Sequence, residues 1–198
     1  MDLSSFFGVL SALTLLLAYW FYIKQTQKGQ STPNPSSWGI WLLVGMINCI
    51  TYFYIVSSIW ESFLAFAYTF CVAIVFIYAL KKGKFSKITN LEIIIFILTL
   101  IIIIFWRVTA NNSIANLLLQ VIYVLAYIPT IGGLLKGYSK EYPLSWTTSV
   151  IAYGFSIISI ALNFNGNWVS IVFPLINGVL GNGLVVVLIY HNKFKLQK

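Results

Sequence analysis

Charged residues are scarce in this chain. They make up 8% of its 198 residues, while apolar residues make up 60%. A soluble domain carries roughly three times that charged share. Among the charged residues the acidic ones are the rarer, with four against twelve lysines and arginines. The composition therefore argues against a water-soluble fold.

Sites of familiar chemistry are also missing from the sequence. Cys49 and Cys71 each lie inside an apolar run without CxxC spacing, so neither a disulfide framework nor a zinc site is indicated. The four acidic residues fall at the ends of the expected helices or in loops. No nucleophile triad, phosphate-binding loop or metal cluster is present. We therefore expect neither an enzyme nor a cofactor.

Long apolar runs are what the chain has instead. A membrane-spanning helix needs about 20 mostly apolar residues, and seven segments approach that length. They lie near residues 4–23, 38–58, 62–80, 90–106, 114–135, 144–163 and 168–190. The sequence thus predicts an all-α membrane protein with seven transmembrane helices, for which the lipid bilayer is a partner.

The basic residues alternate over the short connections between these runs. Eleven lysines lie in the first, third and fifth connections and in the C-terminal tail, and Arg107 alone lies on the other side. By the positive-inside bias, we expect a multi-pass protein of the cell membrane with its N-terminus outside and its C-terminus in the cytoplasm. Nucleic-acid binding needs basic residues clustered on one folded face, so no nucleic acid partner is expected.

An internal repeat at a spacing of 108 residues divides the chain. A three-helix unit that enters from outside ends inside, so a second unit of the same orientation needs one extra crossing. The repeat therefore predicts two parallel three-helix bundles, over residues 1–89 and 108–198, joined by a linker helix over residues 90–107. The matches in register are Leu17-Ala18-Tyr19 with Leu125-Ala126-Tyr127, Lys28-Gly29 with Lys136-Gly137, Pro35 with Pro143, and Ser37-Trp38 with Ser145-Trp146.

This 3+1+3 arrangement resembles the SWEET and PQ-loop superfamily of small-solute transporters. The stretch Tyr127-Ile128-Pro129-Thr130 is similar to the family's proline segment near the inner end of a bundle's first helix. The resemblance implies that Pro129 lets the helix bend as an inner gate opens, with Gly132 and Gly133 loosening the same turn. It also implies a substrate site near the bilayer midplane, between the two bundles.

The resemblance extends to two candidate site residues. The run Pro174-Leu175-Ile176-Asn177-Gly178 is similar to the family's Pro-Asn-Gly run, which implies that Asn177 hydrogen-bonds the substrate. The segment around Asn48 is similar to the family's segment with a pocket aromatic, whose place Tyr52 takes here.

Polar side chains inside the expected helices complete the candidate site, because a polar group in hydrocarbon needs a partner or a cavity. The candidate substrate-binding residues are Asn177, Asn48, Tyr52, Tyr68, Tyr153, Ser156 and Asn182. The alternative for the asparagines is a hydrogen bond between helices, each on the order of 1 kcal/mol. Trp38 and Trp146 are expected to anchor the membrane interface. Glycines 178, 181 and 183 are expected to allow close helix packing.

The function that these observations favour is facilitated transport of a small neutral or polar solute by alternating access between the bundles. A sugar, an amino acid and a vitamin precursor all remain open as the substrate. Passive transport is favoured because no ionisable residue lies at mid-depth.

The alternative is a receptor or sorting protein of the same architecture, which would need a charged cavity. A retinal photoreceptor would need a lysine within the last helix. The first lysine in that part of the sequence is Lys193, beyond the expected span, so this function is not favoured. The sequence leaves open whether the chain forms homo-oligomers.

Overall fold

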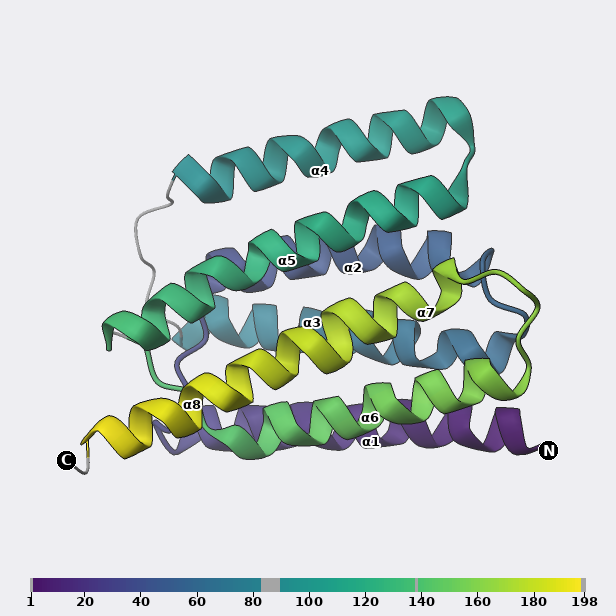
Figure 1. Ribbon diagram of the computed structural model, residues 1–198. Coiled ribbons are helices and arrows are strands. Elements are labelled where there is room, and N and C mark those ends of the chain that lie inside the picture. The colour runs from purple at the N-terminus through teal and green to yellow at the C-terminus, as the bar shows by residue number, and fades with distance from the viewer. Residues whose placement is uncertain (1, 83–89, 138, 197–198) are drawn as a thin grey trace.

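The computed structural model describes residues 2–82, 90–137 and 139–196, and those residues form helices without any strand (Figure 1). The helices are α1 (Leu3–Gln27), α2 (Pro35–Phe53), α3 (Ile59–Lys82), α4 (Asn90–Thr109), α5 (Asn112–Lys136), α6 (Pro143–Leu162), α7 (Val169–Phe173), the π-helix η1 (Pro174–Asn182) and α8 (Gly183–Leu196). Because α7, η1 and α8 are continuous, the described part of the chain has seven helices long and apolar enough to cross a membrane. The prediction of an all-helical fold with seven helices able to span a membrane is thus confirmed for the described residues.

Successive spans run in opposite directions, so the connections gather at two ends of the molecule (Figure 1). The lysines with described side chains all belong to one end, which we call the lysine end: Lys24, Lys28, Lys81, Lys136 and Lys140. Asp2, Glu61 and Arg107 belong to the opposite, N-terminal end. The lysines at positions 82, 84, 87, 193, 195 and 198 have side chains outside the described residues.

Residues of the internal repeat adopt matching local structures. Pro35 and Pro143 each begin a helix, where a fixed φ suits the first turn and a missing N–H costs nothing. Gly29 and Gly137 follow α1 and α5 with φ of +70° and +75°, the left-handed conformation that glycine adopts without strain. Residues 108 positions apart in the sequence therefore occupy equivalent helix starts and turns in the structure.

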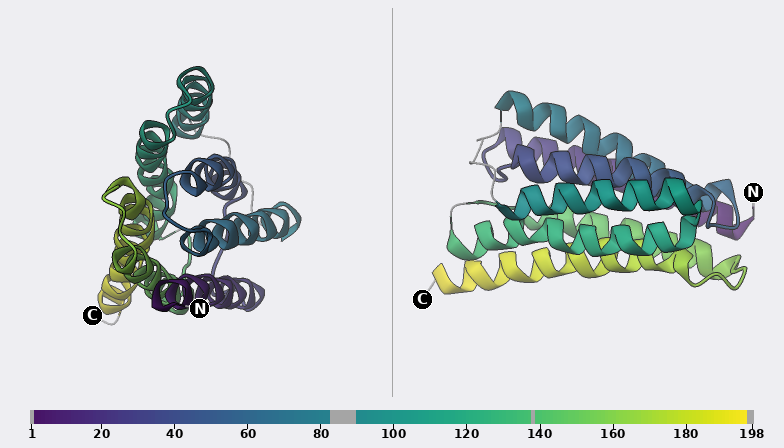
Figure 2. Two further views of the ribbon diagram at one scale, coloured as in Figure 1. Left: turned by 90° about the vertical axis from the view of Figure 1, so that its right-hand side faces the viewer. Right: turned by 90° about the horizontal axis from the view of Figure 1, so that it is seen from above.

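The helices pack as two sets around a shared interior. α3 contacts both α1 and α2, and the rod formed by α7, η1 and α8 contacts both α5 and α6. The two sets face each other through α1 against α6 and through α2 against α5. α4 contacts α5 and α2 and lies at the periphery (Figures 1 and 2). Most of its large apolar side chains are exposed, as expected for a helix that faces lipid.

The contact between α1 and α6 is close at the N-terminal end. Ser4 Oγ donates to the carbonyl of Ser159 at 2.9 Å, and Ser159 Oγ donates to the carbonyl of Ser4 at 2.8 Å. A Cβ atom on Gly8 would lie 2.5 Å from the carbonyl oxygen of Trp60, so α1 also lies against the start of α3. Small residues allow such close approach of helices in membranes.

The last span is not the regular α-helix that the sequence predicts. Pro174 lacks a backbone N–H, and from there to Asn182 the helix widens into a π-helix. Asn182 Nδ2 donates to the carbonyls of Asn177 at 2.9 Å and Gly178 at 2.8 Å, which satisfies acceptors of the widened turns. Extended π-helical segments are rare and frequently lie at functional sites.

Candidate functional site

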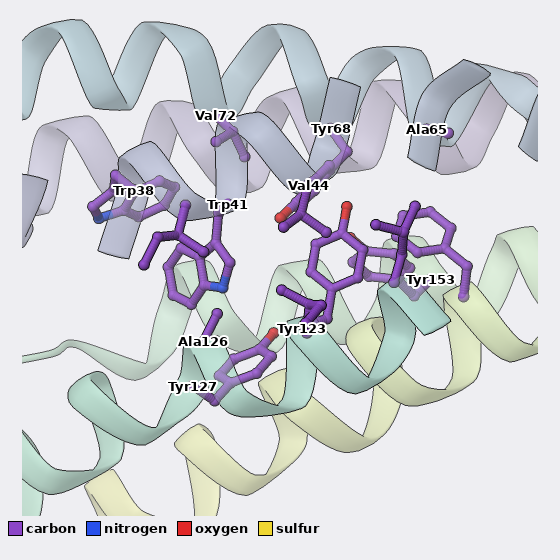
Figure 3. Close-up of a cluster of buried hydrophobic side chains, with 14 of the residues drawn as sticks. Trp38, Trp41, Val44, Ala65, Tyr68, Val72, Tyr123, Ala126, Tyr127 and Tyr153 are labelled. Carbon is purple, nitrogen blue, oxygen red and sulfur yellow. The ribbon is translucent and has the colours of Figure 1, made fainter. Parts of the chain in front are cut away.

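Aromatic rings form a connected column through the interior, from the lysine end toward the N-terminal end. We call the following residues the aromatic column: Tyr19, Tyr22, Trp38, Trp41, Tyr52, Tyr68, Tyr123, Tyr127, Trp146, Tyr153 and Phe173. Neighbouring ring centroids are 5.0 to 6.5 Å apart, the range in which aromatic pairs attract each other. In Figure 3, Trp41 on α2 and Tyr127 on α5 point toward each other across the interior, with centroids 5.4 Å apart.

Two pairs within the aromatic column are related by the internal repeat: Tyr19 with Tyr127, and Trp38 with Trp146. The expectation that Trp38 and Trp146 anchor the membrane interface is wrong. Their side chains are 4% and 6% exposed, because both turn inward to meet Trp41. The two helix sets thus contribute equivalent rings to one interior.

Two small cavities lie within the aromatic column. Their volumes are about 30 Å³ and about 20 Å³, enough for a water molecule or two. Both are lined by Tyr19, Trp38, Trp146, Ser149 and Asn182. Among the described residues, none that lines either cavity is charged. Pockets that enclose small-molecule ligands measure about 300–1,000 Å³, so the interior is closed in this conformation.

Three of the candidate site residues line these cavities: Tyr68, Tyr153 and Asn182. Asn177 lies behind them, where its Nδ2 donates to the Tyr153 hydroxyl at 3.1 Å. Its carbonyl accepts from the Tyr127 hydroxyl at 2.9 Å. Asn177 therefore holds two tyrosines of the cavity wall instead of forming the wall itself.

Glycines of η1 bring those tyrosine rings against the backbone. A Cβ on Gly178 would lie 2.1 Å from Cγ of Tyr153, and one on Gly181 would lie 2.6 Å from Cε2 of Tyr127. Gly183 differs, since no described atom lies within 4 Å of the corresponding position. The close-packing interpretation holds for two of the three glycines, and their partners are aromatic side chains.

Asn48 belongs to a separate buried cluster between α2 and α5. Its Oδ1 accepts from Asn116 Nδ2 at 3.0 Å and from Gln120 Nε2 at 3.1 Å. Asn116 Nδ2 also donates to Thr51 Oγ1 at 3.1 Å. These four side chains are buried and do not line either cavity. The contacts of Asn48 are therefore hydrogen bonds between helices, which was the alternative to substrate binding for the asparagines.

Tyr52 and Ser156 also lie away from the two cavities. The Tyr52 hydroxyl donates to the carbonyl of Ser170 at 2.7 Å, which joins α2 to α7. Ser156 is buried beside the Tyr52 side chain. Toward the same end, Glu61 accepts from Asn163 Nδ2 at 3.0 Å. Such contacts hold the two helix sets together at the N-terminal end.

Contacts between the two sets also close the lysine end. Glu141, in the connection between α5 and α6, accepts from the Tyr22 hydroxyl at 3.2 Å and from Trp146 Nε1 at 3.1 Å. Burial raises the pKa of Glu141 to about 7, although hydrogen bonds from Trp146, Ser31 and Tyr22 act in the opposite direction. Ser145 Oγ donates to Gln25 Oε1 at 3.0 Å. One of the contacts that close this end is thus made by a carboxyl group that titrates near neutral pH.

The expected gate residues lie in the last part of α5. Pro129 follows Tyr127 by two residues, and the helix continues past Gly132 and Gly133 to Lys136. The carbonyl of Gly133 accepts from the backbone N–H of Ser139 at 3.2 Å, outside the helix. A bend of α5 at Pro129 would therefore move Tyr127 relative to this turn, and the hinge role stays a prediction.

Sequence reasoning missed most of the cavity wall. Tyr19, Trp41, Tyr127 and Ser149 line the cavities but were not expected to. The internal repeat indicated part of this wall, since Tyr19 and Tyr127 are matched positions.

Comparisons of this chain with protein-family models, with curated proteins and with solved structures find no match.

Proposed function

We propose that this protein is a facilitative transporter of a small neutral solute, working by alternating access between two three-helix bundles. The observation that carries the proposal is the uncharged, aromatic-lined cavity pair between two helix sets, to which each set contributes equivalent residues. In this proposal residues 1–89 and 108–198 form the bundles, and α4 is the linker that gives them the same orientation. The lysine end faces the cytoplasm by the positive-inside bias.

The helix contacts support a rocking motion of the two sets. Contacts between the sets occur at both ends, through Ser4 with Ser159 at one and Tyr22 with Glu141 at the other. The interior between them is closed, as in an occluded state of a carrier. Breaking the contacts at one end while keeping those at the other would open the cavities to one side of the membrane.

The chemistry of the cavity wall favours a neutral solute that carries both hydroxyl or amide groups and an apolar face. Tyrosine and tryptophan rings offer flat apolar surfaces, and the Asn182 amide and Ser149 hydroxyl offer hydrogen bonds. A sugar and a vitamin precursor fit this description, whereas an amino acid would place its carboxylate and ammonium groups against uncharged lining residues. A receptor that captures a carboxylate would need a cationic side chain in the cavity, and none of the described lining residues supplies one.

The proposal is tested in two steps with the full-length chain. A thermal-shift screen of purified protein against sugars, amino acids and vitamins identifies the solute, because a ligand of the folded state raises its stability. Counterflow of that solute is then measured in proteoliposomes. We expect saturable exchange that a protonophore does not change. The proposal would be refuted if none of the screened solutes raised the melting temperature and none was exchanged in proteoliposomes.

A matched pair of variants ties transport to the cavities. Ser149→Val places two methyl groups into cavity space of only about 20 to 30 Å³, and we expect at least a tenfold loss of counterflow. Thr148→Val replaces a hydroxyl by a methyl group at the neighbouring position, which lines neither cavity, and should leave counterflow within twofold. Asn177→Ala should reduce counterflow by freeing Tyr153. Undiminished transport by Asn177→Ala would remove Asn177 from the site.

A further inference from the structure

Another hollow lies at the lysine end, on the outer side of the contact between α1 and α6. Its volume is about 370 Å³, more than ten times that of either interior cavity. Among its lining residues are Trp20, Lys24, Gln25 and Lys28 from α1 and the residue that follows it, together with Tyr142 and Leu144 from the start of α6. We call this hollow the α1–α6 groove.

Two unpaired cations lie along the α1–α6 groove. Lys24 and Lys28 are one helical turn apart, and both are exposed. No ion pair to either lysine occurs within residues 2–82, 90–137 and 139–196. Like charges at this spacing repel each other along a helix, so an anion bound between them would relieve the repulsion.

A buried donor without a partner lies in the same groove. Gln25 is 4% exposed, and its Oε1 accepts from Ser145 Oγ. Its Nε2 has no hydrogen-bond partner within the described part of the chain. A buried N–H without a partner is costly, and an oxygen atom of a ligand in the α1–α6 groove would satisfy it. Ammonium groups next to an amide donor match the oxygen atoms of a phosphate.

The apolar part of the groove indicates where this phosphate comes from. Trp20 on α1 and Leu144 on α6 line this groove and are 53% and 45% exposed, so their apolar surface is open to the surroundings of the helices. Aromatic residues at the end of membrane-spanning helices lie at headgroup depth. A free phosphate ion would make no use of these side chains, whereas the glycerol and upper acyl groups of a phospholipid would contact them.

We propose that the α1–α6 groove binds the phosphate of an anionic phospholipid through Lys24, Lys28 and Gln25. Basic recesses between transmembrane helices recognise such headgroups in this way. Glu141 does not oppose binding, since it lies outside the groove lining and is held by Tyr22 and Trp146. The site is separate from the interior cavities and does not depend on the proposed transport activity.

The test uses the purified full-length chain after delipidation. Native mass spectrometry counts adducts of dioleoylphosphatidylglycerol and of dioleoylphosphatidylcholine at equal concentrations. We expect at least fivefold more phosphatidylglycerol adduct. The double variant Lys24→Gln/Lys28→Gln should lose at least four fifths of it, and Lys24→Arg/Lys28→Arg should retain it, because the charges remain.

The control double variant is Lys136→Gln/Lys140→Gln, which removes the same charge at the same end. Lys136 is the repeat equivalent of Lys28, and neither control lysine lines the α1–α6 groove. This variant should bind phosphatidylglycerol as the unmodified chain does. Equal losses in both double variants would mean a general effect of charge and overturn the site. Sodium phosphate that displaces the lipid at millimolar concentration would instead identify a free-anion site and overturn the lipid assignment.

Discussion

Gly181→Ala tests the packing that holds the cavity wall. The new methyl group would lie 2.6 Å from Cε2, 2.7 Å from Cζ and 2.9 Å from the hydroxyl oxygen of Tyr127. All three distances are shorter than real Cβ contacts, so the ring must move. It is held by Trp41 and Trp146 on its sides and by the hydrogen bond to the Asn177 carbonyl. The substitution therefore disturbs the aromatic column at its centre.

The expected cost follows from these contacts. Overpacking of a filled interior costs about 1–3 kcal/mol, and the lost hydrogen bond adds about 1 kcal/mol. Replacing glycine by alanine in a helix returns about 1 kcal/mol. The net loss is about 1–3 kcal/mol, which lowers the melting temperature by about 2–12 °C at about 2–4 °C per kcal/mol for a chain of this size. Gly183→Ala meets no described atom and should raise it by about 2–4 °C.

Thermal unfolding in detergent, followed by the fluorescence of the buried tryptophans, measures both shifts. Tyr127→Leu removes the three atoms nearest to the new methyl group, so Gly181→Ala should cost less in that background than in the unmodified chain. A cost that is the same in both backgrounds would refute the reasoning, because the two residues would then be independent. A Gly181→Ala variant as stable as Gly183→Ala would refute it as well.

Three further predictions concern contacts between the helix sets. Burial disfavours the charged form of Glu141 and raises its pKa from 4.5 to about 7, so the resulting stabilisation, complete below about pH 4.5, is lost as the pH rises through about 7. Melting temperatures should therefore fall by about 5–10 °C from pH 5 to pH 8 in the unmodified chain, and by clearly less in Glu141→Gln. Asn116→Ala removes the hydrogen bonds from Asn116 Nδ2 to Asn48 Oδ1 and Thr51 Oγ1, while Gln120 still donates to Asn48; it should cost about 1–2 kcal/mol in urea or thermal unfolding. Tyr52→Phe removes the bond to Ser170 and should cost about 1 kcal/mol in the same assay.

Much of the fold could be predicted from the sequence. The number of spans follows from the length of apolar runs, which is a local property that the bilayer thickness makes decisive. The starts of α2 and α6 follow from Pro35 and Pro143, whose ring fixes φ whatever the surroundings. The end of α2 was less predictable: the sequence predicts a span to residue 58, but the helix stops at Phe53. Apolar loop residues beside a membrane carry no stop signal.

Less of the candidate site could be predicted, because residue type does not reveal which way a side chain points. Tyr68, Tyr153 and Asn182 reach the cavities, while Asn48 and Tyr52 bond to neighbouring helices. In a soluble protein, the polar face of a helix reveals its rotation. In these spans most faces are apolar, so the rotation is set by packing against neighbours.

The sequence by itself determined the membrane-spanning character, the number of spans and the separation of charge between the two ends, since each depends on composition along a short stretch. Only the tertiary structure decided that Trp38 and Trp146 turn inward, that the last span widens to a π-helix after Pro174, and that Lys24 and Gln25 share a groove with α6. These features depend on how close and at what rotation two distant helices meet. That geometry is a property of the packed bundle and not of any single segment.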